Sequence, residues 1–427
     1  MIKRLGGCIA SLMTALLIAA APSLAPSLAC AGTLEQAVAR GLARHPDIQV
    51  AQAEVSQATI ELQMAGNGRL PVVSASSGPV ASGVAYDVTV AQPLYDWGQT
   101  RSVIDQKRAL LAQQQANLEV VRDDVALQIV EAWLDIVNDR TQLSLLDDHL
   151  KRLGEVSAMA NARVEGRYAD QSEAGRVNLA VATAEGTRAR LQGDLEDALG
   201  RYALLVDEPA EGLHLPAVPP TVLESVAEDG ALDAAIAGSP LYRKAALGVQ
   251  VADAGVREAN AARFPRLNLE GGVQRREIGG QLVNDSSIGV RFRLASQQGL
   301  SAQQRPELER QRREAARFAA EAEARDLKRT VGTLIRSDAS TAARIGALAD
   351  QAAQAGAVRD LYGEQFLVGR RDIQDLVIMQ TEQFEAERQK VDLVIERLRL
   401  QYRAAAQLGL LTPMMTGDQM QTPGEHP

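Results

Sequence analysis

The stretch Val84-Ala-Tyr-Asp-Val-Thr-Val-Ala-Gln-Pro-Leu-Tyr-Asp-Trp-Gly98 decides the fold, because the side-chain period changes where it ends. Its first eight residues alternate between larger apolar and smaller or polar side chains, which predicts a strand with one apolar and one wet side. From Gln99 to Val164 there is no proline, and Gly154 is the only glycine. At ~1.5 Å per residue this segment predicts a helix of roughly 100 Å. A strand therefore leads directly into a very long helix.

The same plan occurs a second time in the chain. Pro46 and Pro71 are separated by 25 residues, as are Pro240 and Pro265. Each proline pair brackets a helix-like segment, and each segment is followed by alternating strand patterns and then by long helical stretches. Chance spacing of prolines is the alternative, but the order of the elements also matches, which indicates an internal repeat.

The repeat predicts the domain organisation. Residues 209–220 are rich in proline, which is typical of a linker. The first predicted repeat covers 32–208, with a strand pair at about 70–92 and a helical hairpin at about 97–202. A linker over 209–231 follows. The second predicted repeat covers 232–412, with a strand pair at about 266–294 and a helical hairpin at about 304–408, and a disordered tail covers 413–427.

The N-terminus predicts secretion. Two basic residues, Lys3 and Arg4, precede a short apolar run, and Ala29-Cys30-Ala31 has the small-x-small pattern of a cleavage site. We expect a signal peptide over 1–31, with cleavage between Ala31 and Gly32 and no lipid on Cys30. An N-terminal membrane anchor is the alternative, although the apolar run is short for a spanning helix of ~20 residues. No later segment has 18 consecutive apolar residues, so a membrane-spanning mature chain would need strands.

Composition excludes several classes of protein. Aromatic residues make up only 3% of the 427 residues, which favours long, thin helical packing over several compact cores. The formal net charge of −9 disfavours a nucleic-acid partner. The four histidines are isolated, and no glycine-rich phosphate loop follows a strand. We therefore predict no metal site, no cofactor and no enzymatic activity.

Several short motifs occur in a familiar order over roughly residues 33–411. They are Thr33-Leu-Glu-Gln-Ala37 with His45-Pro-Asp47, Gln92-Pro-Leu-Tyr-Asp-Trp-Gly98, Glu131-Ala-Trp-Leu-Asp135, and Val368-Gly369 with Asp372-Ile373. In this order, and with the repeat, the chain resembles the TolC family of outer-membrane efflux and export channels. The resemblance implies a mostly α fold with a small β part. Long α-helical hairpins form a periplasmic tunnel, and four strands per chain contribute to a 12-stranded outer-membrane β-barrel shared by a trimer.

A membrane barrel built from these strands also requires several chains. A bacterial barrel needs about eight strands or more, and an open four-stranded sheet would leave unpaired edges in lipid. The resemblance implies a homotrimer in the bacterial outer membrane that extends into the periplasm. It also implies a passive duct of a tripartite efflux pump or a type I secretion system, working with a periplasmic adaptor protein and an inner-membrane transporter. The alternative is a soluble periplasmic coiled-coil adaptor or scaffold, which should carry a compact β-domain instead of two separated strand pairs. The cargo, whether a drug, a metal, a protein or an adhesin, stays open.

The resemblance also implies where the partners and the gate lie. It places the two hairpin tips at the far periplasmic end, where they would contact the adaptor; the tip residues are Val164, Glu165, Gly166 and Arg167, and Val368, Gly369 and Arg370. Arg371 and Asp375 match an arginine and an acid of the family's closing constellation, and they are four residues apart on one helix face. Asp170 and Glu173 are the candidate partners of Arg371. An ordinary solvated ion pair is the alternative for Arg371 and Asp375.

Overall fold

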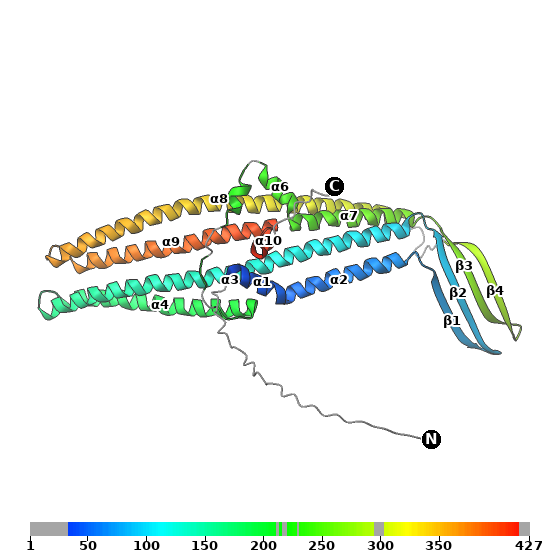
Figure 1. The fold of residues 1–427 in the computed structure, drawn as a ribbon, viewed down its shortest axis with the longest axis horizontal. Helices are drawn as coiled ribbons and strands as arrows, with labels where there is room; N and C mark the ends of the chain where they lie inside the picture. The colour runs from blue at the N-terminus through cyan, green and yellow to red at the C-terminus, as the bar shows by residue number, and fades with distance from the viewer. Residues whose placement is uncertain (1–32, 211–212, 216–219, 229, 294–302, 418–427) are drawn as a thin grey trace, which may run out of the picture.

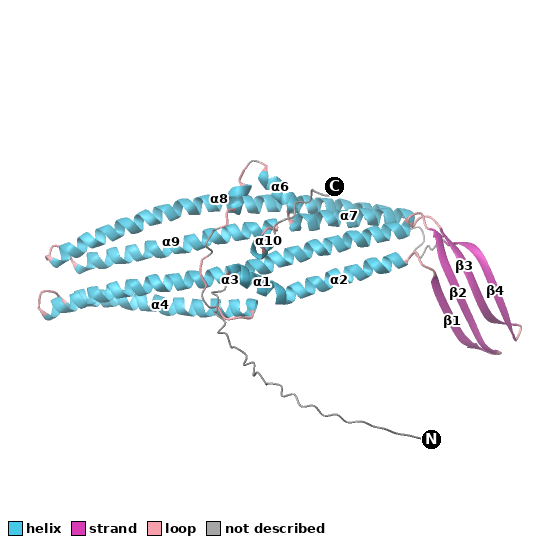
Figure 2. Cartoon of the chain, viewed as in Figure 1, coloured by secondary structure: helices cyan, strands magenta, loops and turns pink. Residues whose placement is uncertain are grey.

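Long helices run along one axis of the molecule, and the strands lie together at one end (Figures 1 and 2). The computed structural model describes residues 33–210, 213–215, 220–228, 230–293 and 303–417. In chain order the elements are α1 (Leu34–Arg44), α2 (Pro46–Asn67), β1 (Val72–Val80), β2 (Gly83–Tyr95), α3 (Gln99–Glu165), α4 (Gln171–Val206), α5 (Val222–Val226), α6 (Ala231–Gly238), α7 (Pro240–Ala261), β3 (Arg266–Ile278), β4 (Gln281–Arg293), α8 (Arg305–Leu367), α9 (Ile373–Leu408) and α10 (Leu411–Thr416).

The helical lengths follow from the absence of helix breakers. The helix α3 has 67 residues and α8 has 63, so each spans about 100 Å. Each long helix packs against a shorter helix toward the strand end and against a second helix toward the opposite end (Figure 1). For α3 these partners are α2 and α4, and for α8 they are α7 and α9. Two equivalent sets of elements thus lie side by side.

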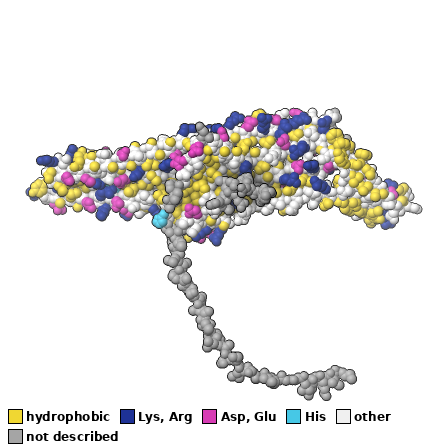
Figure 3. Space-filling view, turned by 45° about the horizontal axis from the view of Figure 1, so that its top comes forward, with side chains coloured by type: hydrophobic (Ala, Val, Ile, Leu, Met, Phe, Trp, Pro, Cys, Tyr) yellow, Lys and Arg dark blue, Asp and Glu magenta, His cyan; other side chains and the backbone are white. Residues whose placement is uncertain are grey.

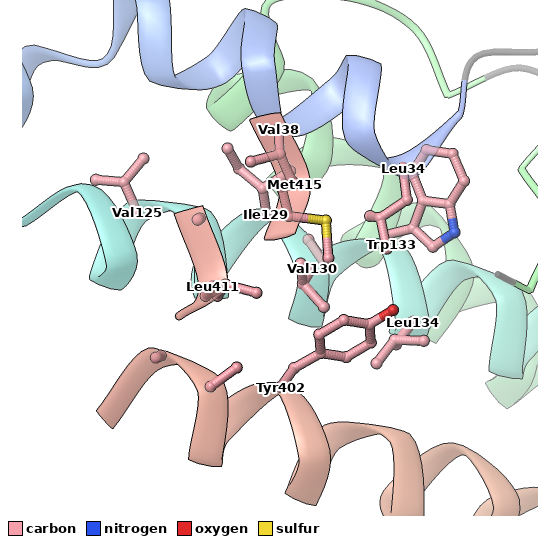
Figure 4. Close-up of a cluster of buried hydrophobic side chains, with 14 of the residues drawn as sticks. Leu34, Val38, Val125, Ile129, Val130, Trp133, Leu134, Tyr402, Leu411 and Met415 are labelled. Carbon is pink, nitrogen blue, oxygen red and sulfur yellow. The ribbon is translucent and has the colours of Figure 1, made fainter. Parts of the chain in front are cut away.

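The main hydrophobic core lies midway along the helices, where α1, α3, α9 and α10 meet (Figure 4). Its largest member is Trp133, which is 2% exposed and donates a hydrogen bond from Nε1 to the carbonyl oxygen of His214 at 2.9 Å. Leu34 and Val38 of α1 and Ile129 of α3 fill the space around it. This core fixes the middle of the molecule, while smaller clusters hold the helices together farther along.

The C-terminal helix α10 corrects the predicted tail. A disordered segment was expected from residue 413, yet α10 continues to Thr416 and buries Leu411 and Met415 in the core. Asp123 of α3 accepts a hydrogen bond from the backbone nitrogen of Thr412 at 2.8 Å. Burial raises the pKa of the Asp123 carboxyl to about 6. Two apolar side chains four residues apart are enough to dock one helical turn, and the prediction overlooked them.

Other predicted boundaries also shift. The helices α5 and α6 begin within the predicted linker over 209–231, and β2 continues to Tyr95, beyond the predicted strand end at 92. A register shift between Pro93 and Tyr95 lets the strand pass a proline that cannot donate a ladder hydrogen bond. The signal peptide over 1–31, its cleavage site at Ala31 and Gly32, and the last residues of the tail lie outside the described residues.

One antiparallel sheet joins the two repeats, in the order β1-β2-β3-β4. The pairing of β2 with β3, for example Val88 opposite Val273, connects the hairpin of the first half to that of the second. Within a single chain β1 and β4 are the edge strands. Among the described helices, none combines the length and the apolar character that crossing a membrane would require.

Candidate functional site

The sheet has one apolar and one polar face. The strand register places Val73, Val90, Leu269 and Ile288 on the same side, together with Phe292. Ile288 is 81% exposed and Phe292 is 76% exposed. Hydrophobic side chains accordingly gather over the strand end of the molecule (Figure 3). So much exposed apolar surface on one face is typical of a surface that contacts lipid or a partner.

The opposite face carries most of the charged side chains of the same strands. In β3 and β4 it holds Glu270, Arg291 and Arg293, and in β1 and β2 it holds Ser74 and Asp87. Alternation along the strands therefore separates two environments across a single layer. Both edges of this layer have unpaired backbone groups within one chain, which is a template for pairing with further strands.

A tight turn joins β2 to α3 and explains the motif at residues 92–98. Trp97 and Gly98 both have left-handed backbone angles, with φ of 57° and 84°. Asp96 caps the helix by accepting hydrogen bonds from the backbone nitrogens of Gly98 at 3.1 Å and Thr100 at 2.7 Å. The Trp97 indole donates to the carbonyl oxygen of Pro265 at 3.0 Å. The turn thus locks the first repeat to the strand junction of the second.

The two hairpin tips reverse the chain with the same hydrogen-bond pattern. Tyr168 donates its backbone N–H to the carbonyl oxygen of Arg163 at 2.9 Å, and Arg370 donates to that of Gln365 at 2.9 Å. The left-handed residue is Gly369 in the second tip (φ 73°), as glycine favours.

The first tip differs from the prediction that glycine provides both reversals. Arg167 holds the left-handed position there with φ of 60°, while Gly166 is right-handed with φ of −73°. The tip needs a small residue at 166 for another reason, since a Cβ atom there would lie 2.7 Å from the ring of Tyr168. Val164 and Glu165 complete the last turn of α3.

Apolar side chains protrude at both tips. Tyr168 is 82% exposed, Leu367 is 76% exposed and Val368 is 69% exposed. The turns that join α3 to α4 and α8 to α9 lie at the end of the helices opposite the sheet (Figure 1). The tips therefore present apolar surface at the position expected for a partner contact.

Arg371 lies where three interactions converge on one guanidinium group. Its Nη1 atom is 3.0 Å from Oδ2 of Asp375, and its Nε atom donates to Oε1 of Gln365 at 3.2 Å. The guanidinium also lies 4.3 Å from the ring centroid of Tyr362. Arg371 therefore ties the start of α9 to the end of α8.

The other two predicted gate residues lie on the first hairpin. Asp170 precedes α4, as Asp372 precedes α9. Glu173 is 3.9 Å from Nε of Arg163, and among the described residues neither acid is within ion-pair distance of Arg371. Arg163 in turn lies 4.8 Å from the ring centroid of Phe366, at the tip of the other hairpin.

Sequence reasoning overlooked these tip contacts. Phe366 packs in one cluster with Ile373, Leu376 and Val177, which joins the two tips of the chain. Phe366 and Tyr362, five and nine positions before Arg371, were a usable signal, because an arginine that follows an aromatic on a helical hairpin can fold back over its ring.

The buried histidine is a packing residue. His149 is 3% exposed and stacks on Phe384 with ring centroids 4.4 Å apart. Burial lowers the pKa of His149 to about 4, so the ring is neutral at pH 7. No group of three or more His, Cys, Asp or Glu in the described part of the chain is arranged to hold a metal ion.

Comparison with known proteins gives a family match over part of the chain and a fold match over most of it. Residues 38–202 match the family model described as outer membrane efflux protein. Among solved structures, the channel CusC aligns with a TM-score of 0.78 and 14% identity, covering 88% of this chain and 92% of that one. The chain has the TolC-like fold of outer-membrane efflux channels.

Two further TolC-like structures agree over the same length. The outer-membrane channel OprN aligns with a TM-score of 0.77 and 20% identity, covering 89% of this chain and 91% of that one. VceC of Vibrio cholerae aligns with a TM-score of 0.75 and 15% identity, covering 88% and 96%. No curated protein sequence matches the chain.

The comparisons establish the fold of the chain. The family model matches less than half of the chain, whereas each of these solved structures covers 88% or more of it, at 14–20% identity. The predicted fold class is thereby confirmed.

Proposed function

We propose that three copies of this chain form one export duct of a tripartite efflux pump or a type I secretion system. The observation that carries the proposal is the open sheet, which has an exposed apolar face, a polar face and two unpaired edges. Three such sheets joined edge to edge, β4 to the next β1, supply twelve strands without a free edge in lipid. Small molecules or proteins would pass along the polar side.

The partners follow from the position of the tips. A periplasmic adaptor protein would contact Val164–Arg167 and Val368–Arg370, and an inner-membrane transporter would supply the cargo. We further propose that the mature chain begins at Gly32. The exposed apolar side chains beside both tip turns support an adaptor contact, since exposed apolar surface is typical of a site that binds a partner.

Fractionation separates this proposal from a soluble adaptor or scaffold. We expect the protein in the outer-membrane fraction, as a species that migrates as a trimer in dodecyl sulfate without heating and as a monomer after boiling. A soluble periplasmic monomer that migrates identically before and after boiling would contradict the duct and favour the alternative.

We expect Gly369→Trp to abolish export of the cargo while leaving trimers in the outer membrane. A Cβ atom at 369 meets no other atom within 4 Å, so the bulky side chain would project from the tip and obstruct the adaptor without disturbing the helices. The left-handed backbone at 369 adds a local cost of roughly 1–2 kcal/mol. Export is measured as drug resistance or secreted protein, with trimers quantified in parallel.

The matched control is Gly369→Ala, which imposes the same backbone cost with a minimal side chain. It should retain most export. Full export with Gly369→Trp would contradict the adaptor contact at this tip, and equal losses in both variants would assign the effect to the backbone turn.

A further inference from the structure

The polar face of the sheet has an uneven charge distribution. At the end nearest the helices it carries Arg266, Arg291 and Arg293, opposed by the single acid Glu270. Farther along the strands the same face carries Asp87 and Asp285 with Arg276. The helix-proximal half is therefore basic, and the distal half is slightly acidic.

The basic half is built around one buried carboxylate. Glu270 is 4% exposed, with its Oε1 atom 2.5 Å from Nη2 of Arg293 and its Oε2 atom 3.4 Å from Nε of Arg291. One acid therefore holds two arginines in place and neutralises only one positive charge. The side chains of Arg291 and Arg293 both remain 62% exposed.

The arginines keep donors for a ligand. A guanidinium group has five N–H donors, and Arg291 and Arg293 each use only part of this set on Glu270. Arg266 donates from Nε to Oε1 of Gln99 at 2.7 Å, which leaves its terminal nitrogens free of that bond.

We propose that Arg266, Arg291 and Arg293 form an anion-binding collar at the inner end of the barrel lumen, selecting cargo that carries carboxylate or phosphate groups. The proposal rests on the proposed trimeric duct, because the polar face becomes a lumen only when three sheets close. Three chains would bring nine arginines and three buried glutamates to one level. Guanidinium groups bind carboxylates and phosphates in a planar, bidentate manner, and rings of basic side chains select anions in pores.

Channel block by tripolyphosphate tests the collar. Purified trimers are inserted in planar bilayers, and tripolyphosphate is added on the side of the barrel. We expect concentration-dependent block of the wild type. In the double variant Arg291→Gln/Arg293→Gln the blocking constant should rise by about tenfold or more, since each ~1.4 kcal/mol of lost interaction is a factor of ten.

Three further variants test how the block depends on the charge of the collar. Glu270→Gln removes the neutralising acid and should strengthen the block. Arg291→Lys/Arg293→Lys keeps the charge and should retain most of it. Arg276→Gln removes an arginine from the distal half of the same face and should leave the block unchanged. The Glu270→Gln result also tests the collar if the double glutamine variant fails to insert.

The possible failures are distinguishable. Wild-type channels that conduct but are not blocked, or are blocked equally in the double glutamine variant, would overturn the collar and leave the duct intact. Wild-type trimers that form no channels would overturn the proposed function, and the collar with it.

Discussion

Gly409→Val should remove most of the folded trimer from the outer membrane. Gly409 ends α9 with a left-handed backbone (φ 76°), which costs a non-glycine residue roughly 1–2 kcal/mol. A Cβ atom at this position would also overlap the Cδ and Cγ atoms of the buried Pro240, at the start of α7. Overpacking of this kind costs about 1–3 kcal/mol. Together these costs are a large part of a typical stability of ~5–15 kcal/mol.

The control uses a second glycine with the same backbone. Gly417 ends α10 with φ of 70°, but a Cβ atom there meets nothing within 4 Å. Gly417→Val should therefore lower the thermal unfolding temperature of purified protein much less than Gly409→Val. Equal trimer levels and equal unfolding temperatures for Gly409→Val and the wild type would show that the α9–α7 contact is not rigid.

Arg371→Ser should raise the single-trimer conductance in planar bilayers. The substitution removes the ion pair with Asp375, the bond to Gln365 and the contact with the Tyr362 ring. An exposed ion pair contributes ~0–1 kcal/mol and an exposed cation–π contact about 0.5–1 kcal/mol. We expect these contacts to be made in the closed tunnel and lost in the open one, so that their removal from all three chains should raise the ratio of open to closed channels by about tenfold or more. Here we propose that Arg371 holds the tunnel closed.

A substitution of Asp375 tests the acidic partner of the same proposed gate. We expect Asp375→Ala to weaken the block by divalent or trivalent cations added on the periplasmic side, because three carboxylates would be lost from the narrowest part. Arg190 and Asp194 form a comparable exposed pair, with Nη1 and Oδ2 2.6 Å apart, on α4 away from the tips. Arg190→Ser should leave conductance and block unchanged. If neither gate variant changes either property, the closing contacts lie elsewhere in the tunnel.

Within the described part of the chain, the predicted partners Asp170 and Glu173 do not contact Arg371. Glu173 contacts Arg163 of its own hairpin, so an ion pair of Arg371 with Asp170 or Glu173 requires a neighbouring chain. The spacing of four residues predicts the bond between Arg371 and Asp375 as a pair on one helix face, and the bond forms although Arg371 precedes α9, which begins at Ile373. This spacing carries no information on contacts between chains, which depend on how the hairpins pack.

The strands show the same division between local and long-range information. Alternation from Val84 to Ala91 predicts which side chains share a face, and the register agrees with it. It does not predict which strand is the neighbour, so the pairing of β2 with β3 appears only in the structure. The extension of β2 through Pro93 was missed because proline usually ends a ladder, and here a register shift accommodates it.

The extents of the long helices were predictable because they depend on the local sequence. A proline-free stretch with one glycine gives α3 almost to the residue, because nothing interrupts its hydrogen bonds. The docking of α10 depends instead on a core assembled from α1, α3 and α9, which are distant in sequence. The left-handed arginine at 167 likewise depends on the turn closing between two packed helices.

Disulfide trapping between chains tests the central claim, a duct closed by edge-to-edge pairing of β1 and β4. Both native cysteines, Cys8 and Cys30, lie in the predicted signal peptide, so engineered cysteines would be the only ones in the mature chain. Ser74→Cys on the polar face of β1 is combined in turn with a cysteine on the same face of β4, at Val283, Asp285, Ser287 or Gly289. We predict that at least one pair gives a covalent trimer in the outer-membrane fraction, which reductant converts to monomer, and that no single variant does so. Monomers alone in every pair after oxidation, with each variant present in the membrane, would contradict the shared barrel.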